Sequence, residues 1–140
     1  MNQVGSKLGS AAALLAKGRL YADIGRHDEA VIALSAALSD FRDMEAKRKE
    51  AATIISLVQV LIEQKNLQAG YDYINEGLQL TETDDFLSER GKLYKLYGRG
   101  LKSEHKTVEA KEYYEKAVEI FEKLGRKNDA EDAKKEGSGV

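Results

Sequence analysis

Residues 14–38 read LLAKGRLYADIGRHDEAVIALSAAL, and this stretch decides the fold. Its large and small residues recur at helical spacing, which places Leu14, Gly18 and Tyr21 on one helix face. After a short polar break that begins at Gly25, a second stripe follows, made of Ala30, Leu34, Ala37, Leu38 and Phe41. Because helices joined by a few residues pack antiparallel, the stretch predicts a helical hairpin.

The same pattern returns every 40 residues. Large positions stay large and small positions stay small, with Val58 as the exception. The aligned columns are Leu14, Ile54 and Tyr94; Gly18, Val58 and Gly98; Tyr21, Leu61 and Leu101; Ala30, Gly70 and Ala110; Leu34, Ile74 and Tyr114; Ala37, Gly77 and Ala117. Internal repeats of this length are typical of solenoids. The sequence therefore predicts an all-α solenoid of three antiparallel helical hairpins.

The period also divides the chain into units. We expect residues 1–10 to be an N-terminal extension or the start of the first helix, followed by repeats at residues 11–50, 51–90 and 91–124. Residues 125–140 are expected to form a polar capping helix and then a flexible tail from Gly137. A polar terminal helix suits the exposed end of a solenoid.

Glycines have two expected roles in this array. A glycine inside a helix costs about 1 kcal/mol relative to alanine, so Gly18, Gly77 and Gly98 are expected where helices cross closely. Gly25 and Gly125 are instead expected at helix ends. Side-chain N-caps for the second helix of each hairpin are expected from Asp28, Asn66 and Thr107.

The composition excludes several classes of protein. The 140 residues contain no cysteine, which excludes disulfides, thiol catalysis and cysteine-ligated metals. They contain 22 basic and 24 acidic residues, a net charge of −2, which argues against a nucleic-acid or membrane-surface partner. No apolar run is long enough for a membrane span or a signal peptide, so we expect a soluble, cytoplasmic protein.

Catalytic chemistry has little support in the sequence. His27 and His105 fall in turns two repeats apart, roughly 20 Å if each helix layer is about 10 Å thick, too far to share a metal. The glycines beside Arg99 lie within a helix and lack the strand that phosphate-binding loops need. We therefore expect no enzyme activity, no metal and no cofactor.

The columns described above resemble those of the tetratricopeptide repeat (TPR) family over about residues 11–124. Two features depart from the family pattern: the unit is 40 residues rather than about 34, and no proline ends a repeat. HEAT repeats are the structural rival because their period also reaches 40 residues. The sequence of small, large and small columns favours the TPR family.

The resemblance implies that the first helix of each hairpin lines a concave groove that binds a protein or peptide. The matching positions are Leu15, Arg19, Asp23, Ile55, Gln59, Glu63, Lys92, Lys95, Arg99 and Ser103. Arg19, Gln59 and Arg99 form one column of long hydrogen-bond donors, and Leu15 and Ile55 would add an apolar floor. This chemistry suits an extended or helical peptide with an acidic patch and an apolar anchor.

Three functions stay open on this basis. The first is a TPR adaptor or scaffold, the second a peptide-sensing regulatory domain, and the third a self-associating oligomer. A clamp for chaperone C-termini is unlike this chain, because only Lys92 agrees with the carboxylate-binding residues of such clamps. Tyr71, Tyr73 and Tyr113 lie off the packing stripe, where they cover either the outer seam between helices or a convex binding patch.

Overall fold

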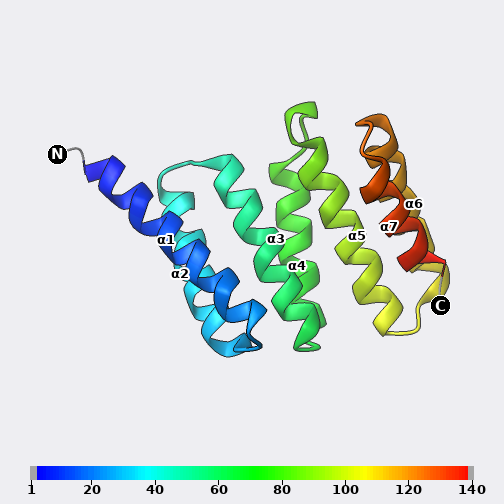
Figure 1. Cartoon of the computed structure of the whole chain (residues 1–140), viewed down its shortest axis with the longest axis horizontal. Coiled ribbons are helices and arrows are strands. Elements are labelled where there is room, and N and C mark those ends of the chain that lie inside the picture. The colour runs from blue at the N-terminus through cyan, green and yellow to red at the C-terminus, as the bar shows by residue number, and fades with distance from the viewer. Residues whose placement is uncertain (1–2, 139–140) are drawn as a thin grey trace.

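The computed structural model describes residues 3–138, and every regular element within them is helical (Figure 1). One turn of 3₁₀ helix, η1 (Asp84–Phe86), precedes the fifth α-helix. The α-helices are α1 (Gln3–Asp23), α2 (His27–Asp43), α3 (Lys47–Glu63), α4 (Leu67–Leu80), α5 (Leu87–Ser103), α6 (Thr107–Lys123) and α7 (Lys127–Gly137). Each packs against the next along the chain. The predicted all-α solenoid of hairpins with a capping helix is confirmed.

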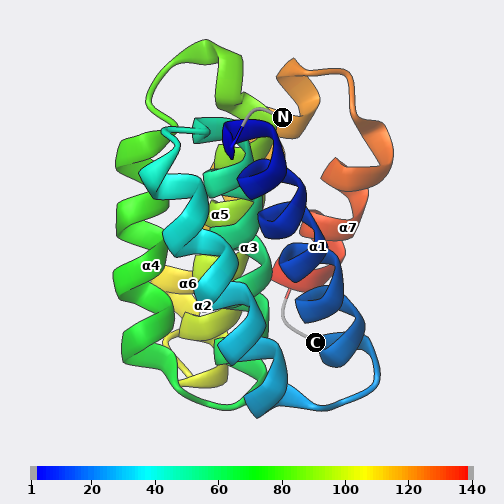
Figure 2. The ribbon, with the colours of Figure 1, turned by 90° about the vertical axis from the view of Figure 1, so that its left-hand side faces the viewer.

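The first helices of the hairpins keep the 40-residue register. α3 begins at Lys47, α5 at Leu87 and α7 at Lys127, so α7 occupies the place of the first helix of a fourth repeat. Figure 2 shows α1 and α7 on one side of the molecule and α4 on the other, with α3 and α5 between them. α1 and α7 therefore lie on the same side of α3 and α5.

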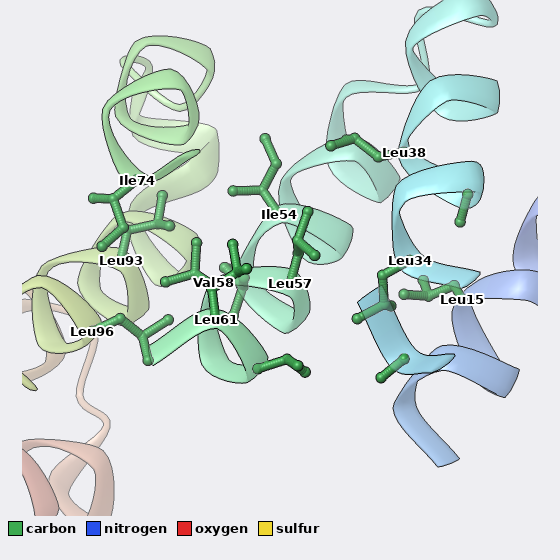
Figure 3. Close-up of a cluster of buried hydrophobic side chains, with 14 of the residues drawn as sticks. Leu15, Leu34, Leu38, Ile54, Leu57, Val58, Leu61, Ile74, Leu93 and Leu96 are labelled. Atoms are coloured by element: carbon green, nitrogen blue, oxygen red, sulfur yellow. The ribbon is translucent and has the colours of Figure 1, made fainter. Parts of the chain in front are cut away.

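The main core is built around α3. Nearly every residue from 51 to 62 is buried, because α3 packs against α1, α2, α4 and α5. Figure 3 shows side chains of these five helices gathered in one cluster, with Leu34, Leu57 and Ile74 fully buried. Val58, which breaks the small column, is also fully buried there. This core fixes the positions of the helices whose exposed side chains form the surface of the array.

Close helix crossings explain the glycine columns. A Cβ on Gly18 would lie 2.6 Å from Leu34 Cγ, and one on Gly98 would lie 2.9 Å from Tyr114 Cδ2. Real Cβ contacts essentially never come this close. The expected close packing at Gly18, Gly77 and Gly98 is therefore confirmed, with Leu93 as the neighbour of Gly77. Gly70 differs, because its nearest neighbour would be 3.6 Å away.

Five helix ends share one turn geometry. A single residue with positive φ closes each of them, at Gly25, Glu45, Lys65, His105 and Gly125. The amide of the next residue donates to the carbonyl five residues earlier, at 2.8–3.0 Å, which is the Schellman arrangement. The confirmed glycine ends are thus two members of a turn that recurs at multiples of 20 residues.

The expected N-caps at Asp28 and Thr107 are wrong. α2 and α6 begin earlier, so the cap positions are Arg26 and Lys106, and Asn66 stands at the α4 cap without a side-chain hydrogen bond. The reason is that the turn is short. The residue whose amide makes the Schellman hydrogen bond is also the N-cap residue of the next helix. The ψ of these three cap residues, 67–73°, is not the extended conformation from which capping side chains usually reach back.

The C-terminal helix extends one residue into the expected tail. α7 includes Gly137, which we expected to begin a flexible tail. A Cβ on Gly137 would lie 2.8 Å from Tyr114 Cβ, so this glycine lets the backbone of α7 approach α6. The last two residues of the expected tail, 139–140, lie outside the described residues.

Candidate functional site

A hollow of about 340 Å³ lies over α1, α3 and α5. It contains five of the expected groove residues: Arg19, Asp23, Gln59, Glu63 and Arg99. A second hollow of about 180 Å³ shares Gln59 and Arg99 with the first. The second is lined by Gln59, Lys92, Lys95, Leu96, Arg99, Phe121 and Asp129. We call these two hollows with shared lining residues the concave groove.

Three expected groove residues do not line these hollows. Leu15 and Ile55 are buried in the main core, with 4% and 8% of their surface exposed. They are drawn inward because α1 and α3 are covered by α2, so they cannot form an apolar floor for a ligand. Ser103 sits in the last turn of α5, where its hydroxyl donates to the Gly100 carbonyl at 2.6 Å.

Polar contacts hold several side chains of the groove. Arg19 Nε donates to Ser56 Oγ at 3.0 Å, which ties α1 to α3. His27 Nε2 lies 3.0 Å from Glu63 Oε2. Within residues 3–138, Lys92 and Lys95 have no carboxylate within 4 Å. The basic character expected at the third-repeat end therefore rests on these two lysines.

Arg99 is engaged by the capping helix. Its Nη2 and Nε donate to the two carboxylate oxygens of Glu136, at 2.8 and 3.0 Å. Tyr114 Oη donates to the same carboxylate at 2.7 Å, and Lys102 Nζ donates to the Glu136 carbonyl at 2.6 Å. We call Arg99, Lys102, Tyr114 and Glu136 the clasp.

The clasp perturbs the ionisation of its members. Burial alone would raise the pKa of the Glu136 carboxyl, but hydrogen bonds from Arg99 and Tyr114 outweigh it and lower that pKa. Burial raises the pKa of the Tyr114 hydroxyl, and its bond to Glu136 adds to the effect. Glu136 is therefore held as an anion between a cation and a neutral phenol.

Sequence reasoning missed Glu136, although a signal for it exists. The Arg99–Glu136 contact spans 37 residues, and so does the Arg19–Ser56 contact. Because α7 continues the 40-residue register, Glu136 stands where Ser56 stands two repeats earlier. Treating residues 127–137 as a fourth first helix would have placed Glu136 opposite Arg99.

A family model for the tetratricopeptide repeat matches residues 11–39, which cover most of α1 and much of α2. The first hairpin therefore matches a tetratricopeptide repeat. The match confirms the resemblance drawn from the columns, and those columns recur in the second and third hairpins. No curated protein matches the chain.

A second feature of the array is a row of stacked tyrosines. Tyr97 stacks on Tyr113 with ring centroids 4.2 Å apart and on Tyr71 at 5.0 Å. Tyr94 lies 6.1 Å from Tyr113, and Lys116 approaches both of these rings. The stack joins α4, α5 and α6, so Tyr71 and Tyr113 cover a packing seam as expected. Tyr73 has no place in the stack.

Two further properties bear on what the TPR array does. Between residues 3 and 138 no helix combines the length and the apolarity that crossing a membrane requires. In the same part of the chain no three His, Asp or Glu side chains group as metal ligands. All-helical TPR scaffolds are typically non-enzymatic and mediate contacts between proteins.

Proposed function

We propose that this chain is a cytoplasmic, non-enzymatic adaptor or scaffold that binds an extended or helical peptide segment of a protein partner in its concave groove. The observation that carries the proposal is that two hollows, which share Gln59 and Arg99, extend over three consecutive first helices. TPR repeats generally mediate protein–protein interaction, and a groove along several helices is suited to an elongated ligand.

The charges of the groove favour a partner with an acidic patch. Lys92 and Lys95 offer ammonium groups at the α5 end, and Arg19 presents a guanidinium at the α1 end. Asp23 and Glu63 add two carboxylates to Arg19 at the α1 end, whereas at the α5 end Asp129 is one carboxylate against two lysines. A peptide with its acidic residues towards α5 would match this gradient.

The test is a charge reversal at two groove cations that are not members of the clasp. Arg19→Glu with Lys95→Glu should weaken capture of the partner from native lysate at least tenfold, because two cations of the groove become anions. Lys47→Glu with Lys123→Glu makes the same change of net charge at residues that line neither hollow. Mass spectrometry identifies the captured protein, and circular dichroism checks helicity. Equal capture by both double variants would refute binding in the groove.

Self-association is a second candidate, favoured by the first hairpin. Leu20 on α1 and Ile24 in the turn that follows it are each 59% exposed, and Ile32 on α2 is 71% exposed. Large apolar side chains that gather at one end of an array are suited to contact with another molecule. Sedimentation velocity over a hundredfold range of concentration tests this candidate, and a monomer throughout would remove it.

A further inference from the structure

α7 is attached to the array by unusually little apolar surface. Ala130 and Ala133 are its only fully buried side chains among the described residues, and the helix has 11 residues. Helices this short are marginal in water on their own. By contrast, α6 buries Tyr114 and Phe121. The position of α7 therefore depends strongly on its polar contacts.

Those polar contacts concentrate at one end of α7. Glu136 receives the hydrogen bonds of Arg99 and Tyr114, and its carbonyl accepts from Lys102. Beside it, the missing side chain of Gly137 allows the close approach to Tyr114. The side chains of Arg99 and Glu136 remain 39% and 27% exposed, so water can reach the clasp and compete for it.

The surface beneath α7 has the character of a helix-binding site. Its apolar part is formed by Tyr94, Ala117, Val118 and Phe121, on which Ala130 and Ala133 pack. Its polar end is formed by Arg99, Lys102 and Tyr114. We call these seven residues of α5 and α6 the α7 seat. An amphipathic helix with two small residues and a carboxylate fits the seat, as α7 itself demonstrates.

We propose that the α7 seat is a binding site for an acidic helix of the partner, and that α7 is a built-in competitor which occupies this seat until such a helix displaces it. The helix that fits carries two small residues three positions apart and a carboxylate three positions further, as Ala130, Ala133 and Glu136 do. This inference rests on the proposed function and deepens it, because Arg99 belongs to both the seat and the concave groove.

Displacement is governed by competition within the chain. α7 is tethered to α6 by a three-residue turn, so its effective concentration at the seat is on the order of millimolar or higher. A helix from another molecule gains access when the contacts of α7 weaken or when its own contacts are better. Removal of the Glu136 charge should therefore open the seat without altering the seat itself.

The test uses the full chain and a labelled peptide of residues 126–138, RKNDAEDAKKEGS, with blocked ends. The Glu136→Gln chain should bind this peptide about tenfold more tightly than the unmodified chain, since bonds to charged groups are the strong ones. The Glu131→Gln chain is the matched control, because Glu131 is exposed and its one ion pair within residues 3–138 is with Lys134. A peptide with glutamine at position 136 should not show this increase in affinity for the Glu136→Gln chain.

Hydrogen exchange supplies a second readout. Amides of α7 should exchange about tenfold faster in the Glu136→Gln chain, while those of α1–α4 stay unchanged. Gly137→Ala should release α7 by a steric route, because its Cβ would overlap Tyr114. Equal peptide affinity in the Glu136→Gln and Glu131→Gln chains, or unchanged exchange of α7 in both release variants, would overturn the proposal. If these experiments fail but capture still depends on Arg19 and Lys95, the α7 seat is refuted and binding in the concave groove is not.

Discussion

Gly18→Ala tests whether the small columns set the spacing of the helices. The new Cβ would lie 2.6 Å from Leu34 Cγ and 2.7 Å from Leu34 Cδ2, about 1 Å inside the usual separation of carbon atoms. Leu34 is fully buried, so its branch point cannot swing into open space. Overpacking of this kind costs about 1–3 kcal/mol. Two carbon atoms of a buried side chain are overlapped, so the cost should lie in the upper part of this range, about 2–3 kcal/mol. Replacing a helical glycine returns about 1 kcal/mol, so we expect a net loss of about 1–2 kcal/mol.

Gly70→Ala is the matched control within the same array. Its Cβ would meet Ile62 Cγ1 at 3.6 Å, an ordinary contact, and the equivalent positions in the other repeats are already Ala30 and Ala110. We expect a gain of about 0.5–1 kcal/mol in the free energy of unfolding. The two variants therefore differ in sign although the chemical change is identical.

Urea denaturation followed by circular dichroism at 222 nm measures both variants. At this chain length 1 kcal/mol corresponds to a shift of about 4 °C in Tm, so thermal scans should separate them clearly. The reasoning would be refuted by a Gly18→Ala chain as stable as the unmodified one, or by a Gly70→Ala chain that loses stability. Either result would mean that helix propensity, and not the contact with Leu34, decides these positions.

Two further predictions concern the turns and the clasp. Lys65→Gly should raise the free energy of unfolding by about 1 kcal/mol, because Lys65 has a φ of 64°, a conformation that favours glycine. Gly25→Ala should lower the free energy of unfolding by about the same amount in the same urea titration, because Gly25 has a φ of 81°. The lowered pKa of Glu136 means that its contribution is present above the ordinary value of 4.5 and is lost as the pH falls through the folded value. Stability measured from pH 6 to pH 2 should therefore fall less steeply in the Glu136→Gln chain, and parallel curves would contradict the clasp.

The repeat made most of the fold predictable from the sequence. A column such as Gly18 and Gly98 is informative because the same small residue faces a large one, Leu34 or Tyr114, at each crossing. The turns were harder to predict, because Lys65 and His105 adopt a conformation that their residue types do not favour. There the packing of two long helices fixes the backbone, and local preference yields.

The groove was predictable only in part, because a column does not say how deep a residue lies. Arg19, Gln59 and Arg99 share a column and line the hollows. Leu15 and Ile55 also share a column, yet the array closes over them. Long polar side chains can extend from a helix into a groove whereas apolar ones are drawn into the core, so the charged members of a first helix are the better guide.

The contact between successive first helices varies along this array although its register does not. At the first step Arg19 meets the hydroxyl of Ser56, and at the third step Arg99 meets the carboxylate of Glu136. At the second step the equivalent residues are Gln59 and Leu96, an amide and a buried apolar side chain. Of these three equivalent pairs only the third joins two full charges, and the third step is also the one at which the following helix buries least. The contact between Arg99 and Glu136 is strong and partly exposed, and it holds α7, which buries fewer residues than α3 and α5. It is therefore the contact through which a partner can most readily change the array.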